Sequence, residues 1–453
     1  MIRRCLVFAL VLVSTQLVAQ ESPVGESRVL PSEETASLVL PVPDERALRL
    51  ADEERVDRGK VPHFAAAHEV QVDPWNDGRW DPLSRGRIRW RLRIHSPGAL
   101  SLSYAFERFS MPEGATFRIH SVDPPKLLAT FSGADQEEHG QLWTPPFLGS
   151  EHLLELILPF ARLDELDLSL ARVHHGYAGF GEPEPKAGEC HRDMVCSEGE
   201  PWGDVARSVA LISIEGVRFC TGFLVNNTAL DGRPFFLTAH HCDIDAEKAP
   251  SVVVMWNHES SVCREGRAFE GEVKGHLRDF QSGAILRASS PSTDIVLLEL
   301  DDRPKDTASV YFAGWDRSGD PPRRSVSIHH PNTDAKRISF DFDPATPTDH
   351  LSEKTRTRGN HWRVADWDVG TTEGGSSGAP LFNRDRQVVG VLHGGYAACG
   401  NQKADWFGRL DLAWRSGGLP ETRIGSWLDP VGSEVLTLDG LDASSVTNVT
   451  APD

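Results

Sequence analysis

The fold of this chain is constrained above all by a succession of short apolar segments separated by turn-forming residues. Segments 87–94 and 99–106 alternate apolar and polar residues with a period of two, which is typical of half-buried strands. Further strands are expected at 209–214, 221–225, 235–238, 252–256, 295–300 and 388–392. A helix is expected only near 423–428, so the sequence predicts an all-β protein.

The cysteines are unevenly distributed along the chain. One is Cys5, and the others are Cys190, Cys196, Cys220, Cys242, Cys263 and Cys399. An even number in an exported chain indicates disulfides, although six cysteines allow fifteen pairings. Because none of the six precedes Cys190, the region before it is expected to be a separate domain.

Residues 1–20 have the layout of a secretory signal peptide. Arg3 and Arg4 precede the apolar stretch 6–13, and a cleavage site is expected near Ala19. We therefore expect a secreted, extracellular protein that loses Cys5 with its leader. The formal net charge of −19 argues against a nucleic-acid binder. The chain has no apolar run of the roughly 18 residues that a membrane-spanning helix needs.

Composition and pattern divide the rest of the chain into regions. Residues 21–81 are acidic and weakly patterned, which predicts an extended leader. Residues 86–170 are expected to form a small β-sandwich, and 176–185 is a linker rich in Gly and Pro. The many short strands that follow predict an antiparallel barrel or sandwich. The tail at 442–453 is small and polar, and we expect it to be disordered.

Two of the candidate functional motifs lie beside apolar strands. His241 follows the strand at 235–238 and precedes Cys242, so an adjacent disulfide would hold its ring in place as a general base. The alternatives are polar residues at a turn or a metal pair with His240, although adjacent residues on an extended chain point to opposite faces. Asp294 begins the strand at 295–300, where it either accepts a hydrogen bond from an imidazole or caps a turn.

The third motif is the Gly-Gly-Ser-Ser-Gly loop at 374–378, which apolar strands follow directly. Glycines beside a nucleophilic serine allow a tight loop that exposes the hydroxyl and aims backbone N–H groups at a developing oxyanion. The alternative is a flexible linker. His241, Asp294 and Ser377 follow the chain order of the chymotrypsin-type β-barrel proteases, which differs from that of subtilisin-type and α/β-hydrolase enzymes.

The chain from Cys190 to about Leu441 resembles the secreted bacterial lysyl endopeptidases, a branch of the chymotrypsin-like serine proteases. The resemblance is carried by CTGFLVNNT at 220–228, FLTAHHC at 236–242, TDIVLLEL at 293–300, AGWDR at 313–317, IHHPN at 328–332, GSSGAP at 375–380 and LHGG at 392–395. The β-rich region before it is similar to the prosegment of these enzymes. The resemblance implies an all-β, two-barrel antiparallel chymotrypsin-like catalytic domain at 187–441, preceded by a β-sandwich-like propeptide at 21–186.

The resemblance also implies roles for individual residues. Ser377 is the nucleophile, His241 is the base and then the acid, and Asp294 orients the imidazole. Backbone N–H groups of Gly375 and Ser377 form the oxyanion hole, and no metal or organic cofactor is implied. The family's disulfides fall at Cys190–Cys399, Cys196–Cys263 and Cys220–Cys242. The last pair is also expected without the resemblance, because it closes a short strand pair beside His241. We interpret His240, His329 and His330 as structural.

Substrate specificity is expected to depend on Asp405. Trypsin-like enzymes carry a carboxylate six positions before the nucleophile, where this chain has Thr371. Lysyl endopeptidases use an aspartate on a later strand, which the resemblance matches to Asp405. Because a buried carboxylate in a closed slot distinguishes an ammonium from a guanidinium, we expect cleavage after lysine. The alternatives are a solvated acid at Asp405, or Glu373 as a second acid lining the site. Substrate binding is also assigned to His393, Gly394 and Gly395.

Two features depart from familiar relatives. In the best-known lysyl endopeptidases a tryptophan stacks on the histidine matched by His393, but residues 349–360 do not align and leave that tryptophan unassigned. In trypsin-type zymogens a new N-terminal amine pairs with an aspartate just before the nucleophile, where this chain has Ser376. We therefore expect activation without that pair, by self-cleavage after Lys186 in the linker.

Together these observations predict a secreted, monomeric serine endopeptidase that cleaves protein or peptide substrates after lysine. Its own propeptide is the expected partner, as an intramolecular chaperone or inhibitor. One alternative is a protease of this fold with specificity for arginine or another residue. The other is a catalytically silent homologue that acts as a binding module, and the intact His, Asp and Ser motifs argue against it.

Overall fold

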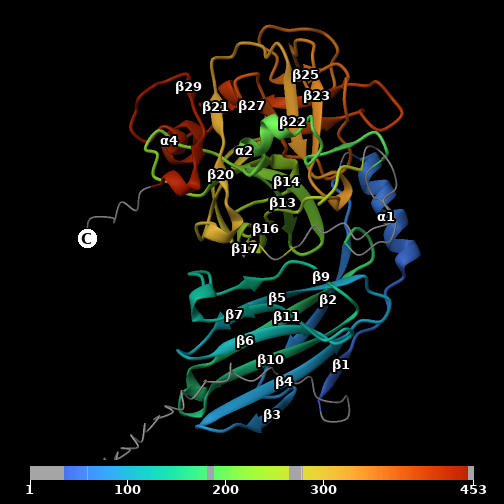
Figure 1. Cartoon of the computed structure of the whole chain (residues 1–453), viewed down its shortest axis with the longest axis vertical. Coiled ribbons are helices and arrows are strands. Elements are labelled where there is room, and N and C mark those ends of the chain that lie inside the picture. The colour runs from blue at the N-terminus through green and yellow to red at the C-terminus, as the bar shows by residue number, and fades with distance from the viewer. Residues whose placement is uncertain (1–34, 59, 181–187, 265–276, 278, 447–453) are drawn as a thin grey trace, which may run out of the picture. The chain divides into compact units, whose positions relative to one another are not determined.

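The first half of the chain forms two β-sheets that share one hydrophobic core. The computed structural model describes residues 35–446 except 59, 181–187, 265–276 and 278 (Figure 1). One sheet contains β1 (Ser37–Val39), β3 (Arg79–Pro82), β4 (Arg87–His95), β6 (Thr116–Ser121), β7 (Lys126–Phe131) and β10 (Glu151–Pro159). The other contains β2 (Ala65–Val72), β5 (Ser101–Ser110), β8 (Leu142–Trp143), β9 (Phe147–Leu148) and β11 (Asp167–Gly176).

Strand β4 illustrates why this sequence forms a sandwich. Its apolar side chains Trp90, Leu92 and Ile94 are buried in the core shared by the two sheets. The arginines between them lie on the other face, where Arg91 pairs with Asp81 and Arg93 pairs with Glu151 at 3.1 Å. Because successive side chains of a strand point to opposite faces, the period of two places one set in the core and the other against acids. The predicted strands at 87–94 and 99–106 are confirmed.

The prediction of an extended leader at 21–81 is wrong for its described part, which contains the helix α1 (Glu45–Asp57) as well as β1, β2 and β3. The half-buried face of α1 makes polar contacts: Asp52 accepts hydrogen bonds from the Tyr177 hydroxyl at 2.6 Å and from the His63 backbone N–H at 2.9 Å. A helix held by polar groups lacks the apolar stripe that reveals helices in sequences. Tyr177 and Phe180 are themselves buried, so the predicted linker begins as packed structure.

The second half contains two larger, curled sheets. One has seven strands in the order β17-β16-β13-β14-β15-β19-β18, and the other has ten strands with β12-β23-β22-β26-β27-β28-β25-β24 as its main path (Figure 1). The first comprises β13 (Val209–Ile214), β14 (Arg218–Leu224), β15 (Phe235–Ala239), β16 (Val253–Met255), β17 (Phe280–Ser282), β18 (Ala284–Ser290) and β19 (Ile295–Leu300). The second comprises β12 (Arg192–Asp193), β21 (Gly314–Asp316), β22 (Ser325–His329), β23 (Arg337–Asp341), β24 (Thr346–Thr348), β25 (His361–Val364), β26 (Pro380–Phe382), β27 (Gln387–Gly395), β28 (Asp405–Arg409) and β29 (Thr437–Leu438).

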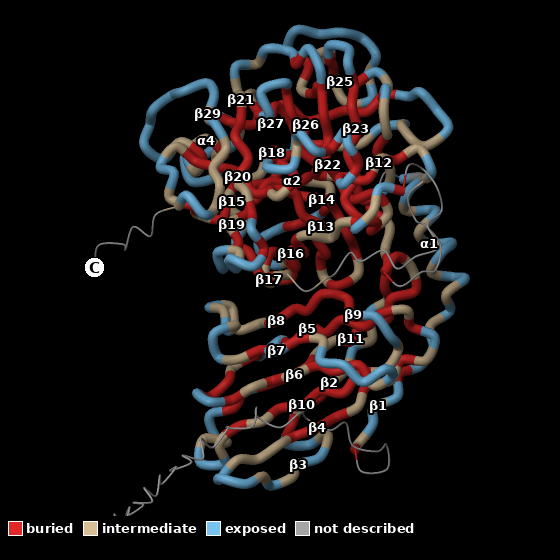
Figure 2. The backbone as a smooth tube through the Cα atoms, viewed as in Figure 1, coloured by how far each residue is buried: buried red, intermediate tan, exposed pale blue. Residues whose placement is uncertain are grey.

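These sheets confirm the predicted all-β class and, within a residue or a few at their ends, the predicted strands of the second half. Their strands are buried along most of their length (Figure 2). A core that includes Phe223, Leu237 and Trp315 joins side chains from both sheets. The three disulfides implied by the family resemblance are present, at Cys190–Cys399, Cys196–Cys263 and Cys220–Cys242.

The remaining helices are short: α2 (Gly203–Ala206), α3 (Leu410–Ala413) and α4 (Ile424–Leu428), the last at the predicted position. The predicted disordered tail is partly folded, because β30 (Leu441–Asp442) pairs with β20 (Tyr311–Phe312) and Asp442 forms an ion pair with Arg207 at 2.6 Å. Residues 447–453 lie outside the described residues, as do the predicted signal peptide and Lys186. Among the described helices, none has the length and apolar character needed to cross a membrane.

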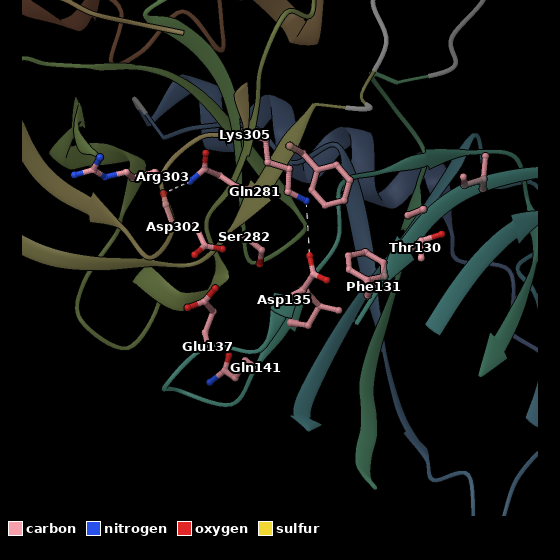
Figure 3. A pocket seen from close by; sticks show the side chains of 14 residues that line it. Thr130, Phe131, Asp135, Glu137, Gln141, Gln281, Ser282, Asp302, Arg303 and Lys305 are labelled. Carbon is pink, nitrogen blue, oxygen red and sulfur yellow. Dashed lines mark hydrogen bonds and ion pairs between the residues drawn. The ribbon is translucent and has the colours of Figure 1, made fainter. Parts of the chain in front are cut away.

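The N-terminal sheets contact the seven-stranded sheet directly, and the chain from Thr35 onward forms one compact unit. His139 and Asp301 are joined at 3.0 Å, and the Trp143 backbone N–H donates to the Ser282 hydroxyl at 3.2 Å. A cavity of about 240 Å³ lies at this contact, lined from one side by residues 128–142 and from the other by residues 280–305 (Figure 3).

Candidate active site

The structure brings His241, Asp294 and Ser377 together although 136 positions separate the first from the last. His241 lies in a short 3₁₀ turn at the end of β15, beside the Cys220–Cys242 disulfide. Its Nδ1 is 2.7 Å from Asp294 Oδ2, and its Nε2 is 2.9 Å from Ser377 Oγ. The imidazole is therefore held between a carboxylate and a hydroxyl, each within hydrogen-bond distance.

Asp294 is 2% exposed, and its backbone has the left-handed φ of 57° just before β19. Its Oδ1 accepts the His241 backbone N–H at 2.8 Å, and its carbonyl accepts the His240 backbone N–H at 3.0 Å. Because a carboxylate can only accept in these bonds, the Nδ1 of His241 carries a proton, and the Nε2 lone pair faces Ser377. This is the tautomer that a general base needs.

The loop that presents Ser377 requires glycine at two positions. Gly375 and Gly378 have φ values of 87° and 89°, which side-chain-bearing residues rarely adopt. A Cβ at Gly378 would lie 2.1 Å from the Thr221 carbonyl oxygen, and one at Gly375 would lie 2.1 Å from the Phe219 ring. Thr221 also anchors the loop, because its backbone N–H donates to the Ser377 carbonyl at 2.8 Å. The loop is therefore embedded in the core, which contradicts the flexible-linker alternative.

His393 stacks on His241, with ring centroids 5.3 Å apart and an angle of 22° between the planes. The position beside His393 that sequence reasoning left unassigned is occupied by His350, whose ring lies 3.5 Å from that of His393 at an angle of 11°. Three imidazoles thus form a continuous stack from His350 to His241. Burial lowers the pKa of His393 to about 3, and it also lowers the pKa of His350.

His361 fixes the orientation of His393 from the side. The Asn360 amide donates to the Ser292 carbonyl, so its oxygen faces the Nδ1 of His361 at 2.7 Å. An amide oxygen only accepts, which places the His361 proton on Nδ1 and leaves its Nε2 to accept from the Nδ1 of His393 at 3.0 Å. The neutral His393 ring therefore turns an unprotonated Nε2 toward Asp294 Oδ2, at 3.8 Å.

Asp405 begins β28 and is 1% exposed. The Thr372 hydroxyl and the Trp367 indole N–H donate to its Oδ2 at 2.6 and 2.8 Å. Burial raises the pKa of Asp405, although these two hydrogen bonds and the Ala397 backbone N–H favour the ionised form. A Cβ at Gly395 would lie 2.5 Å from Asp405 Oδ1, so the backbone can approach this oxygen so closely only with glycine at this position. Asp405 is buried, which contradicts the alternative of a solvated loop acid.

The other polar residues named from the sequence form hydrogen bonds or ion pairs with residues outside the group of His241, Asp294 and Ser377. Glu373 lies 3.2 Å from His191 Nε2 and accepts the backbone N–H groups of Gly188 and Cys399 at 3.3 Å. The Nδ1 of His329 is 2.7 Å from the Ser376 hydroxyl, at the position where trypsin-type zymogens have an aspartate. The Nδ1 of His330 donates to the Asp334 carbonyl at 3.1 Å, and His240 Nδ1 lies 3.0 Å from the Ser289 hydroxyl.

His241, Asp294 and His393 also offer one donor atom each within 4.8 Å of one another, which is close enough to hold a metal ion. Both oxygens of Asp294 already bond to His241, through its ring and its backbone N–H. A metal ion would have to displace the ring bond, so we assign none. Sequence reasoning missed His350, His361, Thr372 and Trp367, because each acts through a contact with a residue distant in the chain.

Comparisons with known proteins show the family to which this chain belongs. The family described as "Lysyl endopeptidase, C-terminal domain" matches residues 185–408, and the family described as "Lysyl endopeptidase N-terminal domain" matches residues 47–177. A lysyl endopeptidase of Pseudomonas aeruginosa strain PAO1 is 28% identical over 358 residues, which cover 72% of this chain and 74% of that protein.

Solved structures similar to this chain include two of the Rv3671c protease. Its inactive form is 17% identical, with a TM-score of 0.31, and the match covers 49% of this chain and 92% of that chain. The active form, from M. tuberculosis, is 18% identical, with a TM-score of 0.29, and the match covers 51% of this chain and 86% of that chain.

Proposed function

Since this chain belongs to the lysyl endopeptidase family and is a serine endopeptidase with a chymotrypsin-like fold, we propose that it cleaves peptide bonds after lysine through Ser377, His241 and Asp294. The observation that carries the catalytic assignment is the placement of the His241 ring, 2.7 Å from Asp294 and 2.9 Å from Ser377.

In the proposed reaction, His241 Nε2 takes the Ser377 proton as Oγ attacks the carbonyl carbon of the scissile bond. Asp294 stabilises the imidazolium that forms and keeps the proton on Nδ1. The backbone N–H groups of Gly375 and Ser377 donate to the oxyanion of the tetrahedral intermediate. His241 then gives its proton to the leaving amine, and a water molecule attacks the resulting acyl-enzyme, again with His241 as the base.

Asp405 is proposed to bind the lysine side chain that precedes the scissile bond. Its carboxylate is almost fully buried, so an uncompensated negative charge there is costly, and a substrate ammonium would relieve that cost. Gly394 and Gly395, at the end of β27, are proposed to line the substrate cleft. Gly395 supports this assignment because it lies directly beside the carboxylate, where a Cβ would be only 2.5 Å from Asp405 Oδ1.

We further propose that residues 1–20 direct secretion, that 21–186 is a propeptide removed by self-cleavage after Lys186, and that the mature enzyme is a monomer. The contacts of the N-terminal half support a role in folding or inhibition. The Phe64 ring lies 6.2 Å from the Phe219 ring, which in turn packs against Gly375 of the serine loop. A prosegment in this position reaches the loop that carries the predicted oxyanion donors.

A serine-directed phosphonylating reagent tests the catalytic assignment. The processed enzyme is incubated with the reagent, and the labelled residue is identified by mass spectrometry. We expect a single phosphonyl group on Ser377, loss of peptidase activity in proportion to labelling, and no label in Ser377→Ala. Labelling of another serine with equal loss of activity would contradict the assignment.

A further inference from the structure

The carboxylate of Asp405 is bonded asymmetrically. The two side-chain donors that reach it, the Thr372 hydroxyl and the Trp367 indole N–H, both end on Oδ2, at 2.6 and 2.8 Å. Neither of these side-chain bonds reaches Oδ1, which lies on the side of Gly395, and the Ala397 backbone N–H is a further donor to the carboxylate. The two oxygens of this buried carboxylate therefore have different surroundings.

The arrangement is built from three separate parts of the fold. Asp405 opens β28, Thr372 lies on the loop that leads to Ser377, and Trp367 follows β25. The Trp367 ring packs edge-on against Phe407 of β28, with centroids 6.2 Å apart. Because all three side chains are buried or nearly so, the positions of the two donors are fixed before substrate arrives.

Lysine and arginine place different demands on such a carboxylate. A guanidinium binds a carboxylate most strongly as a fork, with two parallel N–H groups that each need one oxygen. An ammonium is a compact charge and can bond to a single oxygen. When Oδ2 already accepts two hydrogen bonds, the fork has only Oδ1 to use and leaves an N–H group without a partner in a buried slot, which is costly.

We propose that Thr372 and Trp367 are positioning residues that set the preference for lysine over arginine by occupying one oxygen of Asp405. This inference rests on the proposed function, in which Asp405 binds the side chain preceding the scissile bond. It assigns a specificity role to two residues that need not touch the substrate. They act by determining which oxygen of the Asp405 carboxylate the substrate side chain can bond.

The test compares matched peptides that differ only in Lys or Arg before the scissile bond. Thr372→Val removes the hydroxyl donor with little change of shape, and Thr372→Ser keeps the donor as a matched control. For each enzyme, kcat/KM is measured for both peptides, with active enzyme counted by phosphonyl titration of Ser377. We expect Thr372→Val to lower the Lys:Arg ratio of kcat/KM about ten-fold, and Thr372→Ser to keep it within about two-fold of wild type.

A second readout separates positioning from general damage. Loss of a donor to the ionised form raises the pKa of Asp405 further, so the acid limb of kcat/KM for the Lys peptide should move to higher pH in Thr372→Val. Equal losses for both peptides with an unmoved acid limb would overturn the proposal. Trp367→Phe removes the other donor and gives the same test if Thr372→Val does not fold. Wild-type enzyme that fails to prefer lysine would instead refute the proposed function.

Discussion

The contact between the N-terminal sheets and the protease sheets contains a pair of acids. Their protonation should change the free energy of unfolding of the chain. Glu137 and Asp302 line the same cavity, and their carboxyl groups face each other (Figure 3). Burial, followed by the negative charges of Asp302 and Asp301, raises the pKa of Glu137 to about 7. His139, which is 3.0 Å from Asp301, opposes this rise. Asp135 and Lys305, also on the cavity wall, form a pair at 3.8 Å.

The size and sign of the effect follow from this pKa. The pKa of Glu137 is raised from 4.5 to about 7 on folding. Its contribution to the free energy of unfolding is therefore fully present below pH 4.5 and is lost as the pH rises through about 7. The full shift corresponds to about 3 kcal/mol at 1.36 kcal/mol per pH unit. Glu137 is only partly buried, and solvent screening reduces the expected value to about 1 kcal/mol.

We substitute Glu137→Gln in the full-length chain, in a Ser377→Ala background that lacks the proposed nucleophile. The free energy of unfolding is measured in urea at pH 5 and pH 8 for the parent, for Glu137→Gln and for Glu138→Gln, an exposed neighbour used as a matched control. Glutamine cannot ionise, so between pH 5 and pH 8 the free energy of unfolding of Glu137→Gln should fall by about 1 kcal/mol less than that of the parent. The same pH dependence in all three chains would show that Glu137 does not titrate with a raised pKa in the folded protein.

Two further predictions concern the protease sheets. Removing the ring in His350→Ala exposes His393 to water and raises its pKa from about 3, so protonated His393 competes with His241 for Asp294. The acid limb of kcat/KM should therefore move to higher pH by about half a pH unit or more. His350→Trp keeps a ring stacked on His393 and should not show this shift. Replacing both Cys220 and Cys242 by alanine removes a disulfide between residues 22 positions apart. It should lower the free energy of unfolding in urea by about 3 kcal/mol and leave the far-UV circular dichroism spectrum nearly unchanged.

The strands and the candidate catalytic residues were predictable because their signals are local. The four apolar residues at 295–298 predict a buried strand in an all-β protein, and Asp294 directly precedes them. The glycines around Ser377 mark positive φ angles that few other residues adopt. Each candidate residue of the site therefore stands in a short segment whose pattern already indicates its backbone conformation.

The missed features depend on contacts between distant parts of the chain. Helix α1 is held by Asp52, which bonds to Tyr177 across 125 positions, and it has no apolar stripe. The stacking of His350 on His393 and the hydrogen bond from Trp367 to Asp405 depend on how β25, β27 and β28 are arranged. A histidine or tryptophan in a loop has no local pattern that reveals which ring or carboxylate it will meet.

In the proposed function, Ser377 performs the cleavage and Asp405 directs it to lysine. The most direct test is to digest an unstructured protein with the mature enzyme and to identify every new C-terminus by mass spectrometry. We predict cuts almost all after lysine, none with Ser377→Ala, and a loss or redistribution of cuts with the isosteric Asp405→Asn. Cuts after lysine that persist unchanged in Asp405→Asn, or cuts mainly after other residues in the wild type, would contradict the role of Asp405.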